Sequence, residues 1–247
     1  HSYDRSELYG PHYGYRSSLN SIMVRHLQAK ARALAGFVDL RPGDVVVDIG
    51  SNDGTFVSAF SGRVLCLVGC DPWATRWRGS YPAGSRLIPD FFSADLYRAQ
   101  IGPRPARLVT SIAMFYDLER PLEFMREVES ILADDGVWHL EQSYLPTMLE
   151  MNAYDTICHE HLEYYALKQI KWMAERVGLR ILDVELNDIN GGSFSGDFTN
   201  QEDAYIHGGS TGAVIAFNTF DGNIENHGTI SGGDIGLLVP SGDAQAL

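Results

Sequence analysis

The sequence predicts an α/β fold, with a Rossmann-like, doubly wound parallel sheet flanked by helices. Short runs of β-branched and apolar residues alternate with segments of helical periodicity along the first 190 residues. These runs are continuously apolar, which is typical of strands buried on both faces in a parallel sheet. The first run also leads directly into a glycine-containing loop. Sheets of this kind bind their ligands at the carboxyl ends of the strands.

The elements are expected in a regular order. A helix begins at a cap formed by Ser17, Ser18 or Asn20 and ends near residue 37, because apolar residues recur there at helical spacing. Residues 45–49 then form a β-branched strand. The same patterns predict, in chain order, a helix at 55–60, strands at 64–70, 87–88 and 107–114, a helix at 121–132, a strand at 137–141, a helix at 167–176 and a strand at 179–186.

Composition limits the classes of partner. The 247 residues are 45% hydrophobic and carry a formal net charge of −13. We expect neither nucleic acid nor an anionic membrane as a partner, because both bind basic surfaces. No apolar run approaches the ~18–20 residues that cross a bilayer. Three cysteines without a CxxC pair indicate a reducing compartment, and no signal peptide opens the chain, so we expect a cytoplasmic protein.

The charge is unevenly distributed and predicts three segments. Seven acidic residues, 12 of the 25 glycines and no Lys or Arg follow residue 190. A break in composition of this size indicates a domain boundary. We therefore expect an N-terminal tyrosine segment and helix at 1–40, a core at 41–194, and a Gly-rich acidic extension with short β-rich runs at 195–247. One run, 224–232, resembles a rung of a β-solenoid.

The loop after the first strand predicts a cofactor that contains a nucleoside. Asp48, Gly50 and Gly54 follow the acid–glycine pattern of nucleotide-binding loops, but Asn52 occupies the place of the middle glycine. Gly50 permits a tight turn, and Gly54 allows the next helix to pack close to the ligand. The loop residues expected to bind the cofactor are Asp48, Gly50, Ser51, Asn52 and Gly54.

Acidic residues also end the next two strands. Asp71 lies 21 residues after Gly50, where a carboxylate accepts both ribose hydroxyls. Asp90 and Phe91 end the third strand, where they are placed to bond the adenine amino group and cover its ring. S-adenosylmethionine fits this set best, because it has no pyrophosphate and so tolerates asparagine in the loop. NAD(P) is the alternative cofactor.

A second group of functional residues lies between residues 154 and 165. His159 and His161 flank Glu160, and such a group can supply a base near neutral pH with a carboxylate that orients it. A metal site is not expected, because the HExxH motif places its histidines four residues apart and these are two apart. The alternative interpretation is a pair of solvated or core histidines.

Five motifs occur in an order that resembles a known family. They occupy residues 10–17, 48–55, 141–146, 158–165 and 187–194. Together they resemble the S-adenosylmethionine-dependent C-methyltransferases of the class I superfamily that act on nucleotide-linked keto-deoxysugars. The resemblance covers about residues 3–194. The sequence shows neither the Cys-rich zinc domain nor the C-terminal α/β domain of that family.

The resemblance implies a substrate and a mechanism. The substrate would be a TDP-linked 4-keto-6-deoxyhexose, whose carbon 3 is acidified by the adjacent ketone. His161 would remove that proton, and Glu160 would orient His161 or bind a sugar hydroxyl. Tyr13 and Tyr15 would line the sugar site and stabilise the enolate oxygen, and the enolate would take the methyl group. His159 is the weaker candidate for the base.

Two other functions remain open from the sequence. One is an NAD(P)-linked sugar oxidoreductase, and the other is a non-catalytic S-adenosylmethionine-binding protein whose β-like extension mediates interaction. Where many members of the family carry a histidine after the fourth strand, this chain has Phe115, Tyr116 and Asp117. Any role of that histidine is therefore absent or taken by Tyr116. The oligomeric state is not predicted.

Overall fold

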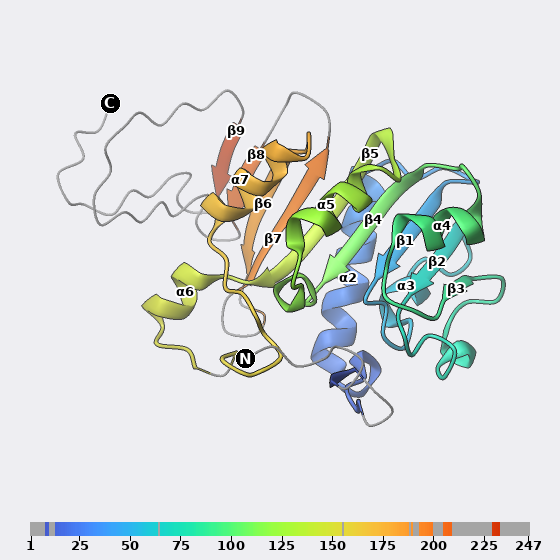
Figure 1. The fold of residues 1–247 in the computed structure, drawn as a ribbon, viewed down its shortest axis with the longest axis horizontal. Helices are drawn as coiled ribbons and strands as arrows, with labels where there is room; N and C mark the ends of the chain where they lie inside the picture. Colours follow the sequence, from blue (N-terminus) through green and yellow to red (C-terminus); the bar gives the residue numbers. More distant parts are fainter. Residues whose placement is uncertain are drawn as a thin grey trace.

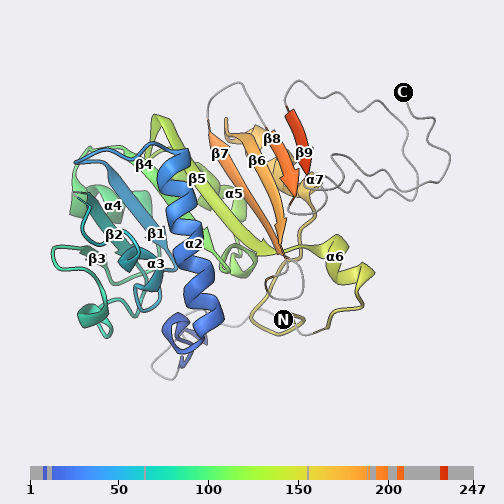
Figure 2. The ribbon, with the colours of Figure 1, turned by 180° about the vertical axis from the view of Figure 1, so that it is seen from behind.

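The chain is described by a computed structural model. Figure 1 shows a central sheet with helices on both of its faces, and Figure 2 shows the same fold from behind. The residues that the structure describes are 8–9, 13–63, 65–154, 156–187, 189, 193–199, 205–208 and 229–232.

The sheet has seven strands in the order β3-β2-β1-β4-β5-β7-β6. The first five strands along the chain pair in parallel, which confirms the predicted Rossmann-like fold. The strands are β1 (Val45–Ile49), β2 (Cys66–Cys70), β3 (Arg86–Ile88), β4 (Ala106–Ile112), β5 (Leu132–Ser143), β6 (Arg180–Asn187) and β7 (Ser193–Thr199).

Strand β7 departs from the expected all-parallel sheet. It lies between β5 and β6 and is antiparallel to both. β6 ends at Asn187 and β7 begins at Ser193, and this connection is too short for the crossover of about a dozen residues that a parallel pair requires. The predicted boundary at residue 194 therefore has to be corrected, because it falls inside a strand of the core sheet.

The helices form two layers. α2 crosses one face of the sheet with α3, and α4, α5 and α7 cover the other face (Figures 1 and 2). Short 3-10 helices link the larger elements. The helical elements are η1 (Ser17–Leu19), α2 (Ser21–Phe37), α3 (Thr55–Ser58), η2 (Arg78–Ser80), α4 (Ala94–Ile101), η3 (Phe115–Asp117), α5 (Pro121–Glu129), α6 (Leu145–Glu150) and α7 (Leu167–Arg176).

The core consists of one apolar cluster on each side of the sheet. All five residues of β1 are buried. Val47 packs with the cluster beneath α4, α5 and α7, whereas its neighbour Val46 packs with the cluster beneath α2 and α3. Alternate side chains of a strand point to opposite faces, so a continuous β-branched run is buried only where both faces are covered. The sheet thus holds the ends of its parallel strands rigidly.

Helix α2 begins where the sequence predicts a cap. The Asn20 side chain accepts hydrogen bonds from the backbone N–H groups of Ile22 and Met23. These are two of the donors that a helix N-terminus leaves without partners. The helix is thereby fixed at the residue where the N-terminal segment leaves the cavity described below.

The predicted extension is only partly described. β8 (Tyr205–Gly208) pairs in parallel with β9 (Thr229–Gly232), which lies within the run expected to resemble a solenoid rung. Parallel pairing is also what successive solenoid rungs show. The other residues of the extension lie outside the described residues. So do residues 10–12 of the N-terminal motif, residue 155 beside the histidine motif, and residues 188 and 190–192 of the C-terminal motif.

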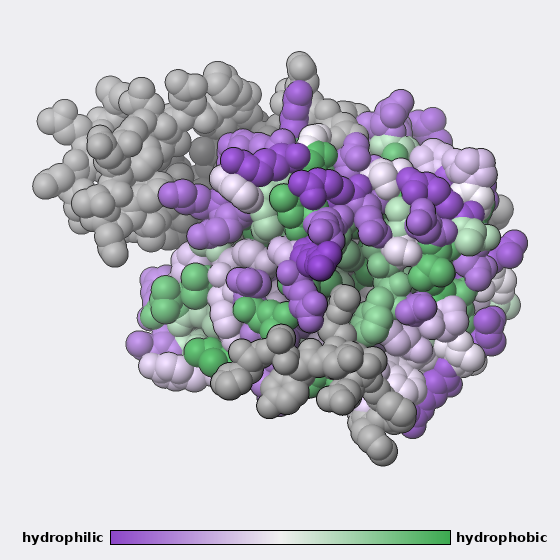
Figure 3. Space-filling model, in the orientation of Figure 1, coloured by the Kyte–Doolittle hydropathy of each residue, from purple (hydrophilic) through white to green (hydrophobic). Residues whose placement is uncertain are grey.

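Apolar side chains are exposed on α6 and on the loop that follows it, among polar ones (Figure 3). Leu149, Met151 and Ile157 are each more than half exposed there. The loop that follows α6 also carries His161, the predicted base. None of the helices in the described part of the chain has the length and apolar character needed to span a bilayer.

Candidate active site

A cavity of about 670 Å³ opens at the carboxyl ends of the parallel strands. Pockets of roughly 300–1,000 Å³ are the usual size for ligands as large as a nucleoside derivative. Every predicted site residue except Gly54 lines it, and these residues are Tyr13, Tyr15, Asp48, Gly50, Ser51, Asn52, Asp71, Asp90, Phe91, Glu160 and His161. The topology therefore brings the loop, the strand-end acids and the histidine motif together.

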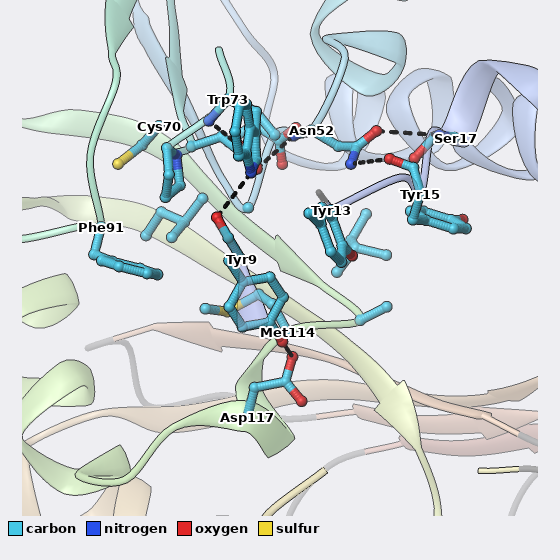
Figure 4. Close-up of a pocket in the computed structure, with 18 of the residues that line it drawn as sticks. Tyr9, Tyr13, Tyr15, Ser17, Asn52, Cys70, Trp73, Phe91, Met114 and Asp117 are labelled. Atoms are coloured by element: carbon cyan, nitrogen blue, oxygen red, sulfur yellow. Dashed lines mark hydrogen bonds between the residues drawn. The ribbon is translucent and has the colours of Figure 1, made fainter. Parts of the chain in front are cut away.

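Asn52 connects the glycine loop to the N-terminal segment. Its backbone φ is +50°, in the left-handed region that asparagine tolerates better than most residues. Its side-chain oxygen accepts a hydrogen bond from the backbone N–H of Ser17 at 3.1 Å, and its amide nitrogen donates to the carbonyl of Tyr15 at 3.0 Å (Figure 4). Glycine could make neither contact. Asparagine at this position therefore holds the tyrosine segment over the cavity.

Asp71 stands at the end of β2, as predicted. Its carboxylate accepts the backbone N–H of Asn52 at 2.9 Å and that of Trp73 at 2.7 Å. Burial raises its pKa, and these two hydrogen bonds act in the opposite direction. A carboxylate held by backbone donors keeps lone pairs directed at the cavity, and it suits a ligand that presents hydroxyl donors.

Asp48 is the most deeply placed acid of the cavity. The Thr110 hydroxyl donates to its Oδ1 at 2.7 Å, and burial raises its pKa to about 7. A buried carboxylate with one neutral donor gains stability when a cation binds beside it. Asp48 therefore fits the positively charged amino group of S-adenosylmethionine, and Asp71 fits the ribose hydroxyls of the same molecule.

Phe91 and Asp90 follow β3 at the far end of the cavity. Asp90 is exposed and accepts the backbone N–H of Phe91 at 2.7 Å. Phe91 makes an edge-to-face contact with Tyr9, with 6.4 Å between ring centroids. The indole N–H of Trp73 donates to the carbonyl of Tyr9 at 2.9 Å. An aromatic wall of this kind suits a flat purine ring.

The prediction that Gly54 binds the cofactor has to be corrected, because Gly54 does not line the cavity. Its φ is +78°, and an added Cβ would lie 2.8 Å from the ring of Tyr81. The Tyr81 hydroxyl in turn hydrogen-bonds to Ser51 Oγ and to the carbonyl of Asn52. Gly54 therefore makes room for the tyrosine that supports the loop, rather than for the ligand.

We expect Gly54→Ala to destabilise the protein more than Gly84→Ala. Both glycines have a positive φ, but nothing lies within 4 Å of a Cβ added at Gly84. The left-handed backbone costs alanine about 1–2 kcal/mol at either position, and the clash with Tyr81 adds about 1–3 kcal/mol at Gly54. Urea unfolding of the two variants measures the difference. Equal losses of stability would contradict this role of Tyr81.

His161 has a defined tautomer. Its Nδ1 lies 2.7 Å from the carbonyl oxygen of Thr156. A carbonyl can only accept a hydrogen bond, so Nδ1 carries the proton and the neutral ring keeps its lone pair on Nε2. The Tyr116 ring packs on the imidazole, with 4.0 Å between centroids. Desolvation lowers the pKa of His161, which favours the neutral and basic form.

Glu160 acts on His161 only through its charge. The negative charge raises the pKa of His161 and partly offsets the desolvation. The ring is oriented by the hydrogen bond that its Nδ1–H donates to the Thr156 carbonyl, so of the two roles expected for Glu160, orienting His161 is not the one it fills. Both side chains line the cavity, so Glu160 is free to contact a ligand. His159 is exposed and does not line the cavity.

Tyr13 and Tyr15 occupy different depths. Tyr13 makes an edge-to-face contact with Tyr9, with 5.1 Å between centroids. Burial raises the pKa of Tyr13, so its phenol stays protonated and can donate a hydrogen bond to an oxyanion. Tyr15 is 49% exposed and lies at the rim. Of the two predicted tyrosines, Tyr13 is the better placed to act on a ligand.

Tyr9 and Asp117 complete the cavity but were not predicted as site residues. The Tyr9 hydroxyl donates to Asp117 Oδ2 at 2.6 Å, so the N-terminal segment spans the cavity from Trp73 to η3 (Figure 4). Burial raises the pKa of Asp117 to about 7. Asp117 follows the fourth parallel strand, and an acid after the carboxyl end of such a strand was a usable signal. Within the described residues, no group of three ligating side chains is arranged to hold a metal ion.

Comparison with known proteins identifies the family of this chain. Residues 22–184 match the family described as a methyltransferase domain. The C-methyltransferase NovU of Streptomyces niveus is 32% identical over 195 residues, which make up 78% of this chain and 46% of NovU. The chain thus spans less than half the length of that relative.

Solved structures share the fold. Magnesium protoporphyrin IX methyltransferase of Synechocystis PCC 6803 has a TM-score of 0.54 and 12% identity, covering 79% of this chain and 92% of that one. An S-adenosylmethionine-dependent methyltransferase of Clostridium acetobutylicum has a TM-score of 0.55 and 11% identity, covering 72% and 92%. Of the two cofactors considered from the sequence, membership of a methyltransferase family favours S-adenosylmethionine. The chain belongs to the methyltransferase domain family and has the Rossmann-like fold that solved methyltransferases share.

Proposed function

We propose that this chain is the core of a C-methyltransferase that acts on a TDP-linked 4-keto-6-deoxysugar. His161 removes the proton at carbon 3, and the resulting enolate carbon becomes the methyl acceptor. S-adenosylmethionine supplies an electrophilic methyl group, which the carbon nucleophile needs. The similarity to a C-methyltransferase supports transfer to carbon.

The geometry of His161 carries the proposal. The Thr156 carbonyl fixes the proton on Nδ1, and the Tyr116 ring holds the imidazole from one side. The free lone pair on Nε2 then belongs to a base whose lowered pKa keeps it neutral at pH 7. Methyl transfer to an oxygen or a nitrogen with its own lone pair has less need of such a base. A carbon acid requires one.

The other cavity residues would divide between cofactor and sugar. Asp48, Asp71 and Phe91 would hold the amino group, the ribose and the adenine of S-adenosylmethionine. Tyr13 would donate a hydrogen bond to the ketone oxygen, which becomes negative as the enolate forms. Glu160 would accept a hydrogen bond from a sugar hydroxyl. Tyr15 would close the rim.

Proton exchange tests the proposal without requiring methyl transfer. The protein is saturated with S-adenosylhomocysteine in D₂O, and loss of the carbon-3 proton of a TDP-linked 4-keto-6-deoxysugar is followed by NMR. We expect exchange above the buffer rate with the native chain and none above it with His161→Ala. Exchange that is unchanged in the variant would remove His161 from this role. A chain that binds S-adenosylmethionine but catalyses no exchange would support a binding protein.

A further inference from the structure

A second cavity, of about 220 Å³, adjoins the first. The two share His161, Tyr116, Met23, Ile112 and Ala113 as walls, so the predicted base stands where they meet. Drug-sized ligands occupy pockets of about 300 Å³ or more. The second cavity is therefore sized for a single small ring.

Glu141 supplies an anchored carboxylate to this cavity. It lies near the end of β5, opposite Ile112 of β4, and both residues line the cavity. The Glu141 carboxylate is 2.6 Å from His26 Nε2 and 3.3 Å from Lys30 Nζ, both on α2. Asn187 of β6 donates to the same carboxylate at 3.4 Å. Three side chains from two elements, α2 and β6, thus hold the Glu141 carboxylate at the cavity wall.

The charge state of Glu141 follows from these contacts. Burial alone would raise its pKa, but the hydrogen bond from His26 and the charge of Lys30 reverse that effect and lower it. The carboxylate is therefore ionised at neutral pH and presents only hydrogen-bond acceptors. Its ligand must be a donor, such as a hydroxyl group.

The remaining walls show which part of a substrate fits. Ser143 lies on the same face of β5 as Glu141, and Thr156 lines the cavity beside His161. No Lys or Arg lines either cavity among the residues that the structure describes. A diphosphate would find acidic and neutral walls there and no cationic partner. An uncharged ring with hydroxyl groups is the ligand that matches.

We propose that the second cavity binds the sugar ring of the methyl acceptor, with a ring hydroxyl donating to Glu141 and the charged diphosphate lying outside both cavities. This assignment rests on the proposed function, since it takes the acceptor to be a keto-sugar. It places the ring between an ionised carboxylate on β5 and the neutral imidazole of His161. Glu141 would then select sugars by the position of one hydroxyl.

Glu141→Gln tests the assignment against Glu185→Gln as its matched control. Glu185 is also paired with Lys30, at 3.1 Å, but it does not line the cavity. Binding of a TDP-linked 4-keto-6-deoxysugar to the S-adenosylhomocysteine complex is measured by calorimetry. We expect Glu141→Gln to weaken sugar binding by about 10- to 100-fold, the worth of a hydrogen bond to a charged group. Glu185→Gln should bind within about twofold of the native chain. Neither should change S-adenosylhomocysteine affinity.

Two further measurements keep the assignment testable if Glu141→Gln does not fold. Sugar analogues lacking the 2-hydroxyl or the 3-hydroxyl are titrated into the native complex. One of the two should bind about 10- to 100-fold more weakly than the complete sugar. Ser143→Val should narrow the cavity and weaken sugar binding without affecting S-adenosylhomocysteine.

The outcomes separate this assignment from the proposed function. Equal sugar affinity in Glu141→Gln and Glu185→Gln would overturn the assignment even if methyl transfer occurs. Sugar binding that depends on Glu141, without any methyl transfer, would support the assignment and overturn the function. Absence of sugar binding to the native complex would overturn the assignment.

Discussion

His161→Gln is expected to lower the rate of methyl transfer by about 100- to 10,000-fold, the usual contribution of a general base. Glutamine preserves much of the side-chain volume but has no basic lone pair near neutral pH. His161 lies in a loop, where it contacts the Thr156 carbonyl and the Tyr116 ring, whereas Asp48 is on β1 and Asp71 directly follows β2. Affinity for S-adenosylmethionine should therefore stay within about twofold. Steady-state kinetics with labelled cofactor gives both values.

His159→Gln is the matched control for this prediction. It removes a histidine from the same motif, at an exposed position that lines neither cavity. Its rate should remain within about twofold of the native rate, as for most exposed substitutions. A large loss of rate with His159→Gln and a small one with His161→Gln would reverse the assignment of the base.

Asp48→Asn is expected to weaken binding of S-adenosylmethionine strongly while making the free protein more stable at pH 8. Its carboxylate is buried, has a pKa raised to about 7, and accepts a hydrogen bond from Thr110 that asparagine can also accept. Ionised Asp48 favours a bound cation, and asparagine does not. We expect a loss of about 10- to 100-fold in affinity, as for a hydrogen bond between charged groups.

The stability effect of Asp48 depends on pH in a definite direction. Its pKa is raised on folding, so its contribution to stability is fully present below the unfolded pKa and is lost as the pH rises through about 7. Asparagine does not ionise, so Asp48→Asn removes this loss of folding stability at high pH. Its melting temperature should exceed that of the native chain at pH 8, by about 2–4 °C per kcal/mol, and the difference should disappear near pH 4. A lower melting temperature at pH 8 would contradict this account.

Much of the fold could be predicted because its strands are buried on both faces. β1 matches its predicted range at both ends, because a continuous β-branched run is typical of a strand buried on both faces of a sheet. β7 was not predicted, because its residues include serines and a glycine, and its strand structure depends on pairing with β5 and β6. α4 and α6 are short, and their sequences carry little helical periodicity. β5 begins at Leu132, ahead of the strand predicted at 137–141, and its pairing with β4 is irregular near that start.

The site residues that could be predicted are those whose type and position in the fold indicate a single role. The strand-end acids lie at the sheet edge that binds ligands, so Asp48 and Asp71 reach the cavity directly. Partners joined only by tertiary structure were not predictable. The Tyr9–Asp117 hydrogen bond links residues 108 positions apart, and the carbonyl that orients His161 belongs to a backbone group. Neither leaves a pattern in the sequence.

One measurement tests the central claim most directly. The chain is incubated with S-adenosylmethionine carrying a ¹³C-labelled methyl group and with a TDP-linked 4-keto-6-deoxysugar, and the product is analysed by ¹³C NMR. The account predicts a labelled methyl group bonded to carbon 3, whose formation is lost in His161→Gln. A labelled methyl group on oxygen, or labelling that persists at the native rate in His161→Gln, would contradict it.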